Sequence, residues 1–505
     1  MSLLTRDEPT TVETARPGRR PLVVVSGLAL PVLFGVLLAL LMPRGPVTPG
    51  DVIVSMLVGV GVGLGTGWLV GRWAMLGSPV LFALCFELGR IGFDAPSLDG
   101  IHLGSSLGLV LFLTGRAFHG LVVLVPMIWA AAIGSAAARR ARTDGNGGKR
   151  WPWISTALLA MVVVAAGLVV SRPGRTDPIL TDGAPLAGSV AEIVSVDLGG
   201  HDQSVIIRGN DITNPVLLYL TGGPGNSDLG YSRTFLEEVE EDFVLVTWDQ
   251  RGIGKSYAAL DPVSTLTVDS AVTDVIELSE FLADRFDDQS IYLFGNSWGS
   301  IIGVLAAEQR PDLYRAYIGA GQMVNPLETD LRLYDQMLEY AADIGDEELL
   351  QLMEGFGRPP YADLYGYMTV LEHYGDLEPY TETAEFAAGV PGIQGIGVSE
   401  YGFMDKLNVF RGLADMGGHL YPQAQDIDFR RDVPELEVPV YLIQGGHELS
   451  ARATLAEEYA SMLEAPSLDV VVFENSGHVP HFEEAGRFHR YLVDVVLAET
   501  EGAQS

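Results

Sequence analysis

Cysteine is almost absent from this 505-residue chain, which has Cys85 as its single example. A disulfide framework and a cysteine-rich zinc site are therefore both excluded. Positive charge is scarce after residue 171. This part of the chain contains 18 Lys and Arg but 57 Asp and Glu, so its net charge is −39. So acidic a surface repels phosphate backbones, and we expect no nucleic-acid partner. Metal-ligand spacings and dinucleotide-binding fingerprints are also lacking, so we expect no cofactor and no metal.

Hydrophobic residues are plentiful by contrast, at 48% of the chain, and they form long runs before residue 172. A bilayer crossing needs about 20 apolar residues. Four runs qualify, namely Leu22–Met42, Val52–Gly71, Leu121–Ala138 (which extends toward Leu107) and Trp153–Ser171. A fifth, Trp73–Phe93, is weaker because it contains Glu87 and Arg90, which we expect to form a packing ion pair rather than a polar pathway. Residues 22–171 are thus predicted to form a transmembrane region of about five helices.

Basic residues beside these runs predict their orientation, because Lys and Arg favour the cytoplasmic side. One cluster precedes the first run and another lies between the fourth and fifth runs: Arg6, Arg16, Arg19, Arg20, and Arg139, Arg140, Arg142, Lys149, Arg150. The loop Asp94–Gly104 has no Lys or Arg and suits the outer side. Five crossings then predict a multi-pass protein of the cell membrane. Residues 1–21 would be a cytoplasmic tail, residues 172–188 a linker, and the acidic remainder extracytoplasmic.

The acidic part alternates β-like runs with helical ones. Buried strands are expected at Val216–Thr221, Phe243–Trp248, Ser290–Phe294, Tyr314–Gly319, Pro439–Gln444 and Leu468–Phe473, after two earlier runs at Val190–Val196 and Ser204–Arg208. Helical spacing occupies Ser232–Glu241, Val268–Phe286 and Ile301–Gln309. This alternation predicts an α/β fold with a mostly parallel sheet. Its core would comprise residues 189–321 and 435–505, with residues 322–434 as a helical cap.

The motif Gly295-Asn296-Ser297-Trp298-Gly299 fits G-x-S-x-G, the nucleophile elbow of hydrolases. That elbow requires a strand before the serine and a helix after it, so that the hydroxyl stands on a sharp turn. Ser297 has both, whereas Ser106, the centre of a second match at residues 104–108, has neither. We therefore predict Ser297 as the nucleophile.

A serine hydroxyl needs a base, and the base needs a partner that orients it. His478 follows the last strand in a Ser-Gly turn, and we prefer it to His481 as the base. Glu448 follows the strand before that, and we prefer it to Asp469 as the acid. The order Ser297, Glu448, His478 is the chain order of α/β-hydrolases.

An acyl oxyanion needs two preorganised donors. The amide of Trp298 directly follows the nucleophile and would supply one. Gly222-Gly223-Pro224-Gly225 ends a strand, and the amide of Gly223 would supply the other. These two amides are the predicted oxyanion hole.

Three motifs together resemble the proline iminopeptidase family of α/β-hydrolases: the Gly222–Gly225 loop, residues 249–256 (Asp-Gln-Arg-Gly-Ile-Gly-Lys-Ser) and residues 295–300. The resemblance covers roughly residues 190–500. It implies a serine peptidase that removes an N-terminal residue, often proline, with cap carboxylates holding the free amine. This chain departs from the pattern at Thr221, where a histidine is usual, at Glu448, where aspartate is usual, and in a cap without the tryptophan-containing pattern of proline-specific members.

The resemblance implies an amine-binding carboxylate early in the cap, and Glu328 is the candidate. Arg251 is expected to anchor a loop rather than to bind substrate. The favoured hypothesis is a membrane-anchored aminopeptidase acting on short peptides through an acyl-enzyme. A carboxylesterase or lysophospholipase would use the same triad, and a membrane receptor on a disused hydrolase fold is a third alternative. An acidic cap pocket would favour the peptidase, and an apolar one the esterase.

Overall fold

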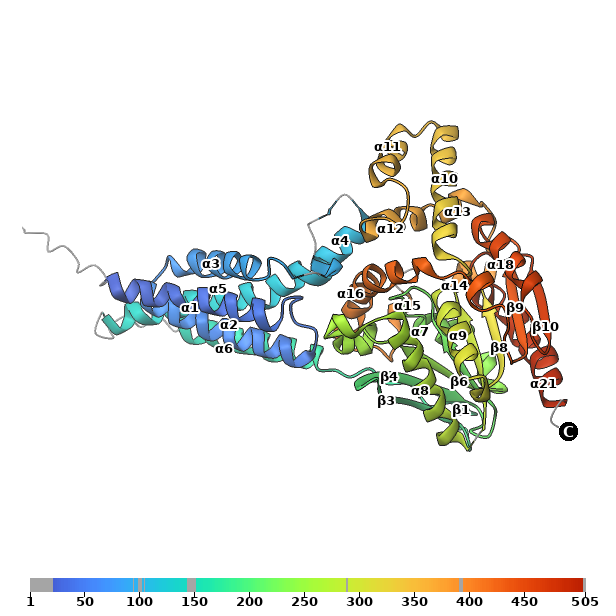
Figure 1. Cartoon of the computed structure of the whole chain (residues 1–505). Helices are drawn as coiled ribbons and strands as arrows, with labels where there is room; N and C mark the ends of the chain where they lie inside the picture. Colours follow the sequence, from blue (N-terminus) through green and yellow to red (C-terminus); the bar gives the residue numbers. More distant parts are fainter. Residues whose placement is uncertain are drawn as a thin grey trace, which may run out of the picture. The chain divides into compact units, whose positions relative to one another are not determined.

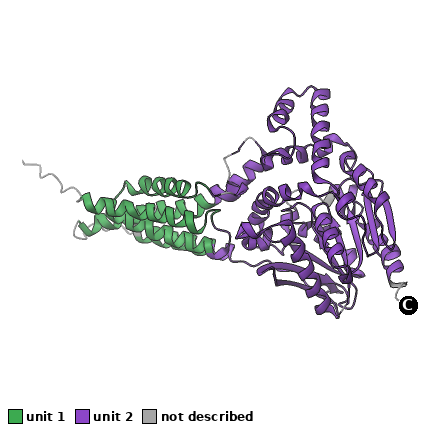
Figure 2. Cartoon of the chain, in the orientation of Figure 1, with its two compact units in different colours: residues 1–45, 51–92, 119–166 green, residues 46–50, 93–118, 167–505 purple. Residues whose placement is uncertain are grey.

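The computed structural model describes residues 21–93, 95–98, 102–103, 105–142, 151–287, 289–389 and 394–502. The chain divides into two compact units, of which the first comprises residues 1–45, 51–92 and 119–166 (Figure 2). The second comprises residues 46–50, 93–118 and 167–505. The predicted cytoplasmic tail (except Pro21), Lys149, Arg150 and part of the predicted outer loop at 94–104 lie outside the described residues.

The first unit is built from apolar helices (Figure 1). They are α1 (Pro21–Leu41), α2 (Pro49–Val70), α3 (Ala74–Gly89), α5 (Phe118–Arg142) and α6 (Trp151–Val170). A segment of 37 residues, Ser106–Arg142, joins α4 (Ser106–Phe112), a π-helical turn at Leu113–Ala117 and α5. By length and composition, this segment, α1, α2 and Trp153–Val170 could each cross a membrane, whereas α3 has only 16 residues. The four long apolar runs are confirmed as helices, and the crossing of the fifth stays a prediction.

Close packing of α2 against α5 depends on the glycines of α2. A Cβ added at Gly63 would lie 2.2 Å from the carbonyl oxygen of Met127, and one at Gly67 would lie 2.2 Å from that of Ala131. Glycine therefore lets the two backbones touch, as small residues do in membrane helix pairs.

The charged residues of α3 and its C-terminal end form the expected ion pair. Nη2 of Arg90 donates to Oε2 of Glu87 at 2.5 Å. The guanidinium also lies over the ring of Phe86, 4.9 Å from its centroid. The arginine is buried by this packing, as a structural pair would be.

An eight-stranded sheet forms the centre of the second unit, in the order β10-β9-β8-β7-β5-β6-β4-β3. Its strands are β3 (Val190–Leu198), β4 (His201–Gly209), β5 (Val216–Leu220), β6 (Val244–Asp249), β7 (Ile291–Asn296), β8 (Tyr314–Ala320), β9 (Val440–Gly445) and β10 (Leu468–Phe473). The β3–β4 and β4–β6 pairs are antiparallel and the others are parallel. The predicted α/β fold with a mostly parallel sheet is confirmed. A small hairpin of β1 (Leu180–Thr181) and β2 (Ala184–Pro185) occupies the expected linker.

Helices cover both faces of this sheet. The central strand β5 shows why, because its side chains are hydrophobic and buried on both faces. Val216, Leu218 and Leu220 face a core shared with α8 (Val268–Phe286) and α9 (Trp298–Gln309). Leu217 and Tyr219 face the opposite core, shared with α20 (Ala485–Tyr491) and a π-helical segment at Leu492–Leu497. Alternate side chains of a strand point to opposite faces, which explains the two cores. Further helices are α7 (Leu229–Phe235), α18 (Ser450–Met462), α19 (Pro480–Glu483) and α21 (Ala498–Gly502).

The chain between β8 and β9 forms a helical insertion where the cap was expected (Figure 1). Its helices are α10 (Pro326–Ile344), α11 (Glu347–Phe356), α12 (Leu364–Glu372), α13 (Tyr374–Leu377), α14 (Ala384–Gly389), α15 (Gln394–Gly397), α16 (Phe403–Leu420) and α17 (Phe429–Asp432). The first starts where Oδ1 of Asn325 accepts the amide of Glu328, and it ends at Gly345 with φ 73°. Both are common helix boundary signals.

Helix α16 is bonded to two upstream connecting segments, namely residues 46–47 between α1 and α2 and the π-helical turn between α4 and α5. The buried guanidinium of Arg411 donates to the carbonyls of Pro46 (2.7 Å) and Thr114 (2.5 Å). The side-chain amide of Asn408 donates to the carbonyl of Val47 at 2.9 Å. These connecting segments therefore belong to the same compact unit as the sheet, although their sequence lies far upstream.

The segment 95–118 makes further contacts with α16. The carboxylate of Asp415 accepts both the amide and the hydroxyl of Ser97, each at 2.8 Å. Leu107 and Leu111 of α4 pack in a small core with Ala414. Buried polar groups need such partners, and here the partners come from distant sequence.

Replacing Arg411 with Met tests this attachment. Met fills a similar volume but leaves the carbonyls of Pro46 and Thr114 without their donor, at about 1–3 kcal/mol for each buried group. We expect the full chain to lose about 2–4 kcal/mol of stability and to melt several degrees lower in detergent. The exposed Arg490→Met is the matched control. Equal melting temperatures for both variants would contradict the structural role of Arg411.

Candidate active site

Ser297 stands on a sharp turn between β7 and α9, with φ 52° and ψ −118°. A Cβ at Gly295 would lie 2.5 Å from the carbonyl oxygen of Gly299, and one at Gly299 would lie 2.0 Å from that of Leu220. Both motif glycines are therefore required by close backbone approach. The strand–turn–helix context expected for the G-x-S-x-G motif is present.

His478 and Glu448 meet at the ends of the neighbouring strands β10 and β9. Nδ1 of His478 lies 2.5 Å from Oε2 of Glu448, whose side chain is buried. Ser297 and His478 line the same cavity. The side-chain amide of Asn296 donates to the carbonyl of His478 (3.2 Å) and so ties the two loops together. The structure thus brings the three predicted triad members to one edge of the sheet.

Arg452 is a fourth charged group at this cluster, and sequence reasoning missed it. Its Nη1 donates to Oε1 of Glu448 (2.8 Å), and its Nη2 donates to the hydroxyl of Tyr374 (2.5 Å). The same Nη1 lies 2.9 Å from Nδ1 of His478. When Nδ1 carries its proton toward Glu448, this contact is electrostatic rather than a hydrogen bond. The sequence did contain a signal for this ion pair. Arg452 follows Glu448 by four residues, a spacing at which opposite charges often pair.

These charges set the titration of the pair. Burial alone would raise the pKa of Glu448, but Arg452 and then His478 outweigh it and hold that pKa at about 2. Burial and Arg452 lower the pKa of His478 below its ordinary 6.5, against the opposing effect of Glu448. The imidazole is therefore neutral near pH 7, the state that a general base requires.

The alternative residues considered from the sequence lie elsewhere. His481 is buried against Phe294, and its Nε2 lies 3.0 Å from the hydroxyl of Tyr219. Asp469 accepts the hydroxyl of Tyr491 (2.7 Å) on β10. Ser106 donates to Glu372 from the first turn of α4, with no strand before it.

The residues predicted as oxyanion donors lie on the loop after β5 and at the start of α9. Gly223, with φ 122°, and Trp298 line the cavity beside Ser297. Gln250 braces both elements, because it accepts from the indole of Trp298 (3.0 Å) and donates to the carbonyl of Thr221 (3.3 Å). The adjacent Arg251 bonds to loop carbonyls, as expected for an anchor: those of Ala259, Pro262 and Thr265.

The cavity has a volume of about 120 Å³ and lies between the sheet edge and the helical insertion. Its lining is mostly apolar or aromatic and includes Ile301, Met323, Leu333, Tyr361, Leu364, Tyr367, Met368, Val370, Leu371, Leu413 and Tyr421. In the described part of the chain, Asp330 is the one carboxylate that lines it.

Asp330 is buried on α10 and accepts two hydrogen bonds. Its Oδ1 accepts the hydroxyl of Tyr421 (2.9 Å), and its Oδ2 accepts the amide of Gln425 (3.0 Å). Burial raises the pKa of Asp330 to about 7, although both hydrogen bonds and the charge of Arg452 oppose the rise. A carboxylate in this state gains much from a cation brought beside it.

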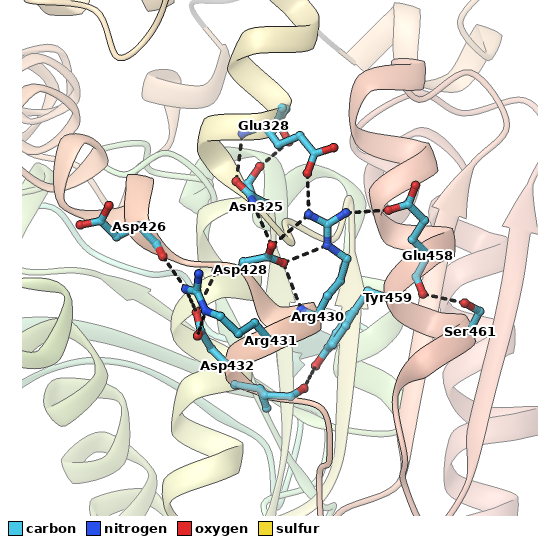
Figure 3. A network of polar contacts seen from close by, with 12 residues as sticks. Asn325, Glu328, Asp426, Asp428, Arg430, Arg431, Asp432, Glu458, Tyr459 and Ser461 are labelled. Atoms are coloured by element: carbon cyan, nitrogen blue, oxygen red, sulfur yellow. Dashed lines mark hydrogen bonds and ion pairs between the residues drawn. The ribbon is translucent and has the colours of Figure 1, made fainter.

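Glu328, the residue expected to bind an amine, does not line the cavity. It pairs with Arg332 and Arg430, each at 2.5 Å. Figure 3 shows the pair with Arg430 in a network that includes Asp428 and Glu458. The reason is helical geometry. Two residues along a helix turn the side chain by about 200°, so Asp330 faces the cavity while Glu328 faces away.

No group of three or more His, Cys, Asp or Glu that could hold a metal ion occurs among the described residues.

Comparison with known proteins places this geometry in a family. A model of the alpha/beta hydrolase fold matches residues 215–485, more than half of the chain. A probable aminopeptidase, YbaC, from Bacillus subtilis is 32% identical over 313 residues, which cover 61% of this chain and 97% of that protein. The chain belongs to the alpha/beta hydrolase family.

Other relatives of this hydrolase bear the iminopeptidase name. A putative proline iminopeptidase from Mycoplasma genitalium is 29% identical over 171 residues, which cover 28% of this chain and 53% of that protein. The crystal structure of proline iminopeptidase from Mycobacterium smegmatis has 19% identity, with 62% of this chain and all of that chain covered, at a TM-score of 0.46. The sequence relatives confirm the kinship predicted from the three motifs.

The charge of Arg452 predicts a change in pH dependence. Replacing Arg452 with Met removes a cation beside His478. The imidazolium form is then less strongly repelled, so the pKa of His478 should rise. The acid limb of kcat/KM should then move to higher pH, as measured on any substrate that depends on Ser297. Arg452→Lys keeps the charge and should keep the limb close to that of the parent. A Met variant with an unchanged limb would show that Arg452 does not set this pKa.

Proposed function

We propose that this alpha/beta hydrolase is a membrane-anchored serine aminopeptidase that releases one apolar N-terminal residue from short peptides. The observation that carries the proposal is the buried carboxylate of Asp330 in the cavity that Ser297 and His478 also line. An α-ammonium bound there would neutralise a charge that burial makes unfavourable. The peptide's free end would thereby fix the position of its first carbonyl.

In the proposed mechanism, His478 removes the proton of Ser297 as Oγ attacks the carbonyl carbon. Glu448 holds the imidazole and stabilises its cation, while Arg452 keeps Glu448 ionised. The amides of Gly223 and Trp298 stabilise the oxyanion. The C–N bond breaks as His478 returns the proton to the leaving amine, which leaves an acyl-enzyme. His478 then takes a proton from water as the water attacks the acyl carbon, and it gives that proton back to Oγ of Ser297 as the ester bond breaks.

The size of the cavity supports removal of a single residue. An engineered cavity of about 150 Å³ holds benzene, so 120 Å³ suits one ring or branched side chain of similar size. Helix α10 and the tyrosines around Asp330 would close the site beyond the amine. This arrangement favours an exopeptidase over an enzyme that binds a long chain on both sides of the scissile bond.

The apolar lining favours a second candidate, a carboxylesterase or lysophospholipase. Such an enzyme would use the same triad and would place an acyl group against Met323, Leu333 and Leu413. It would not require Asp330, because an acyl chain carries no positive charge. A non-catalytic receptor on this fold would require none of the triad.

Asp330→Asn separates these candidates in the full chain, which retains the segments attached to α16. The variant should lose about tenfold to a hundredfold in kcat/KM on prolyl or other aminoacyl anilides, because the amide cannot neutralise the ammonium; this corresponds to about 1.4–2.8 kcal/mol. Hydrolysis of p-nitrophenyl acetate should change little. Ser297→Ala should abolish both activities, by at least a thousandfold.

Glu328→Gln is the matched control, because it alters a carboxylate of the same helix that does not line the cavity. It should leave anilide hydrolysis near the parental rate. Equal loss on anilide and ester in Asp330→Asn would contradict amine binding. Ester cleavage without anilide cleavage would favour the esterase, and no cleavage of either would favour the receptor.

We also propose that the hydrolase lies outside the cytoplasm. The end of α5 contains Arg139, Arg140 and Arg142, and the stretch from there to α6 adds Lys149 and Arg150. This excess of positive charge favours the cytoplasmic side. Because α6 then crosses once, everything after it would be on the other side. This reasoning does not depend on whether α3 crosses the membrane.

Cysteine labelling tests this orientation, since Cys85 is the single native cysteine. In a Cys85→Ala background, Asp202→Cys places a thiol at an exposed position of the hydrolase and Ala141→Cys places one beside the basic cluster. A membrane-impermeant maleimide should label position 202 in intact cells, and position 141 only after permeabilisation. The reverse pattern would place the hydrolase in the cytoplasm.

A further inference from the structure

A second cavity, of about 670 Å³, lies in the hydrolase unit where the chain leaves α6. The segment 169–177 forms one wall and the segment 397–406, which leads into α16, forms the other. The amide of Arg175 donates to the carbonyl of Ser399 (2.8 Å) and joins the two walls. The cavity shares no lining residue with the candidate active site.

Three cationic side chains line this cavity: Arg172, Arg175 and Lys406. Within the described chain none of them has an ion-pair or hydrogen-bond partner for its charged group, and Asp177 is the one carboxylate in the lining. Elsewhere in the unit, cations are typically neutralised, as Arg208 is by Glu240 (2.9 Å). Residues 172–505 carry a net charge of −39, so three unpaired cations in one hollow form a local anion-attracting site.

The same cavity also has an apolar side. Val169, in the last turn of the apolar helix α6, and Val398 and Phe403 line it. The ring of Phe403 contacts that of Phe118, which begins the apolar helix α5, at 5.8 Å. A ligand that satisfies both sides carries a negative charge next to hydrocarbon.

We infer that this cavity binds the phosphate group of an anionic phospholipid. Arginine forks match phosphate oxygens in geometry, and a lysine adds a mobile point charge. In the proposed topology α6 crosses the bilayer, so the site, which begins at Val169 and Arg172 where this apolar helix ends, lies at the depth of the lipid headgroups. Positive charge gathered in one hollow attracts an anionic headgroup by electrostatics alone.

Native mass spectrometry of the delipidated full chain in detergent tests this site. Titration with dioleoyl phosphatidylglycerol should give a one-lipid complex at a concentration at least tenfold lower than titration with dioleoyl phosphatidylcholine. The triple variant Arg172→Gln, Arg175→Gln, Lys406→Gln should lose that preference. Its Ser297-dependent activity and melting temperature should remain, because none of the three residues contacts the candidate active site.

A control variant with the same change of charge is Arg358→Gln, Arg431→Gln, Arg490→Gln, which removes three exposed arginines far from this cavity in sequence. It should keep the parental preference. Equal affinity of the parent for both lipids, or equal loss in the control, would overturn the inference. Displacement of phosphatidylglycerol by inorganic phosphate at comparable concentration would identify a site for free phosphate and overturn the lipid assignment.

Discussion

The strained turn at Ser297 is the constraint around which the hydrolase unit is arranged. A positive φ at a residue other than glycine is unfavourable, and it persists where surrounding structure fixes it. Here β7 is held between β5 and β8, and α9 starts so close to β5 that Gly299 touches the carbonyl of Leu220. The hydroxyl of Ser300 bonds both to the carbonyl of Ser297 (2.6 Å) and to the amide of Met323 (2.9 Å). The turn is thus fixed from both sides.

Around this turn, two buried carboxylates have opposite electrostatic environments. Glu448 has a cation and an imidazole within hydrogen-bond distance, and its pKa falls to about 2. Asp330 has only neutral donors, and its pKa rises to about 7. The difference is one of partners, because both groups are buried. In the proposed enzyme, the first charge is permanent and orients the base, whereas the second awaits a cation from the substrate.

Helix α16 links the site to the parts of the chain that lie far upstream. On one side it lines the cavity with Leu413 and Gly417. On the other, Arg411 bonds to Pro46 and Thr114, and Asp415 bonds to Ser97. A Cβ at Gly225, in the candidate oxyanion loop, would lie 2.6 Å from the carbonyl of Gly412. The helix is therefore held in position by the upstream segments and in turn limits the space around the oxyanion loop.

Local sequence determined the sheet, the four long apolar helices, the turn at Ser297 and the candidates His478 and Glu448. These features depend on hydrophobic periodicity and on residues at fixed positions after strands, which are properties of short segments. Composition cannot tell which side of α10 lines the cavity, and in the structure it is Asp330 rather than Glu328 that lines it. Only the tertiary structure could join Arg411 to Pro46 and Thr114, or bring Arg172 and Lys406 to the lining of one cavity, because such arrangements depend on how the elements pack.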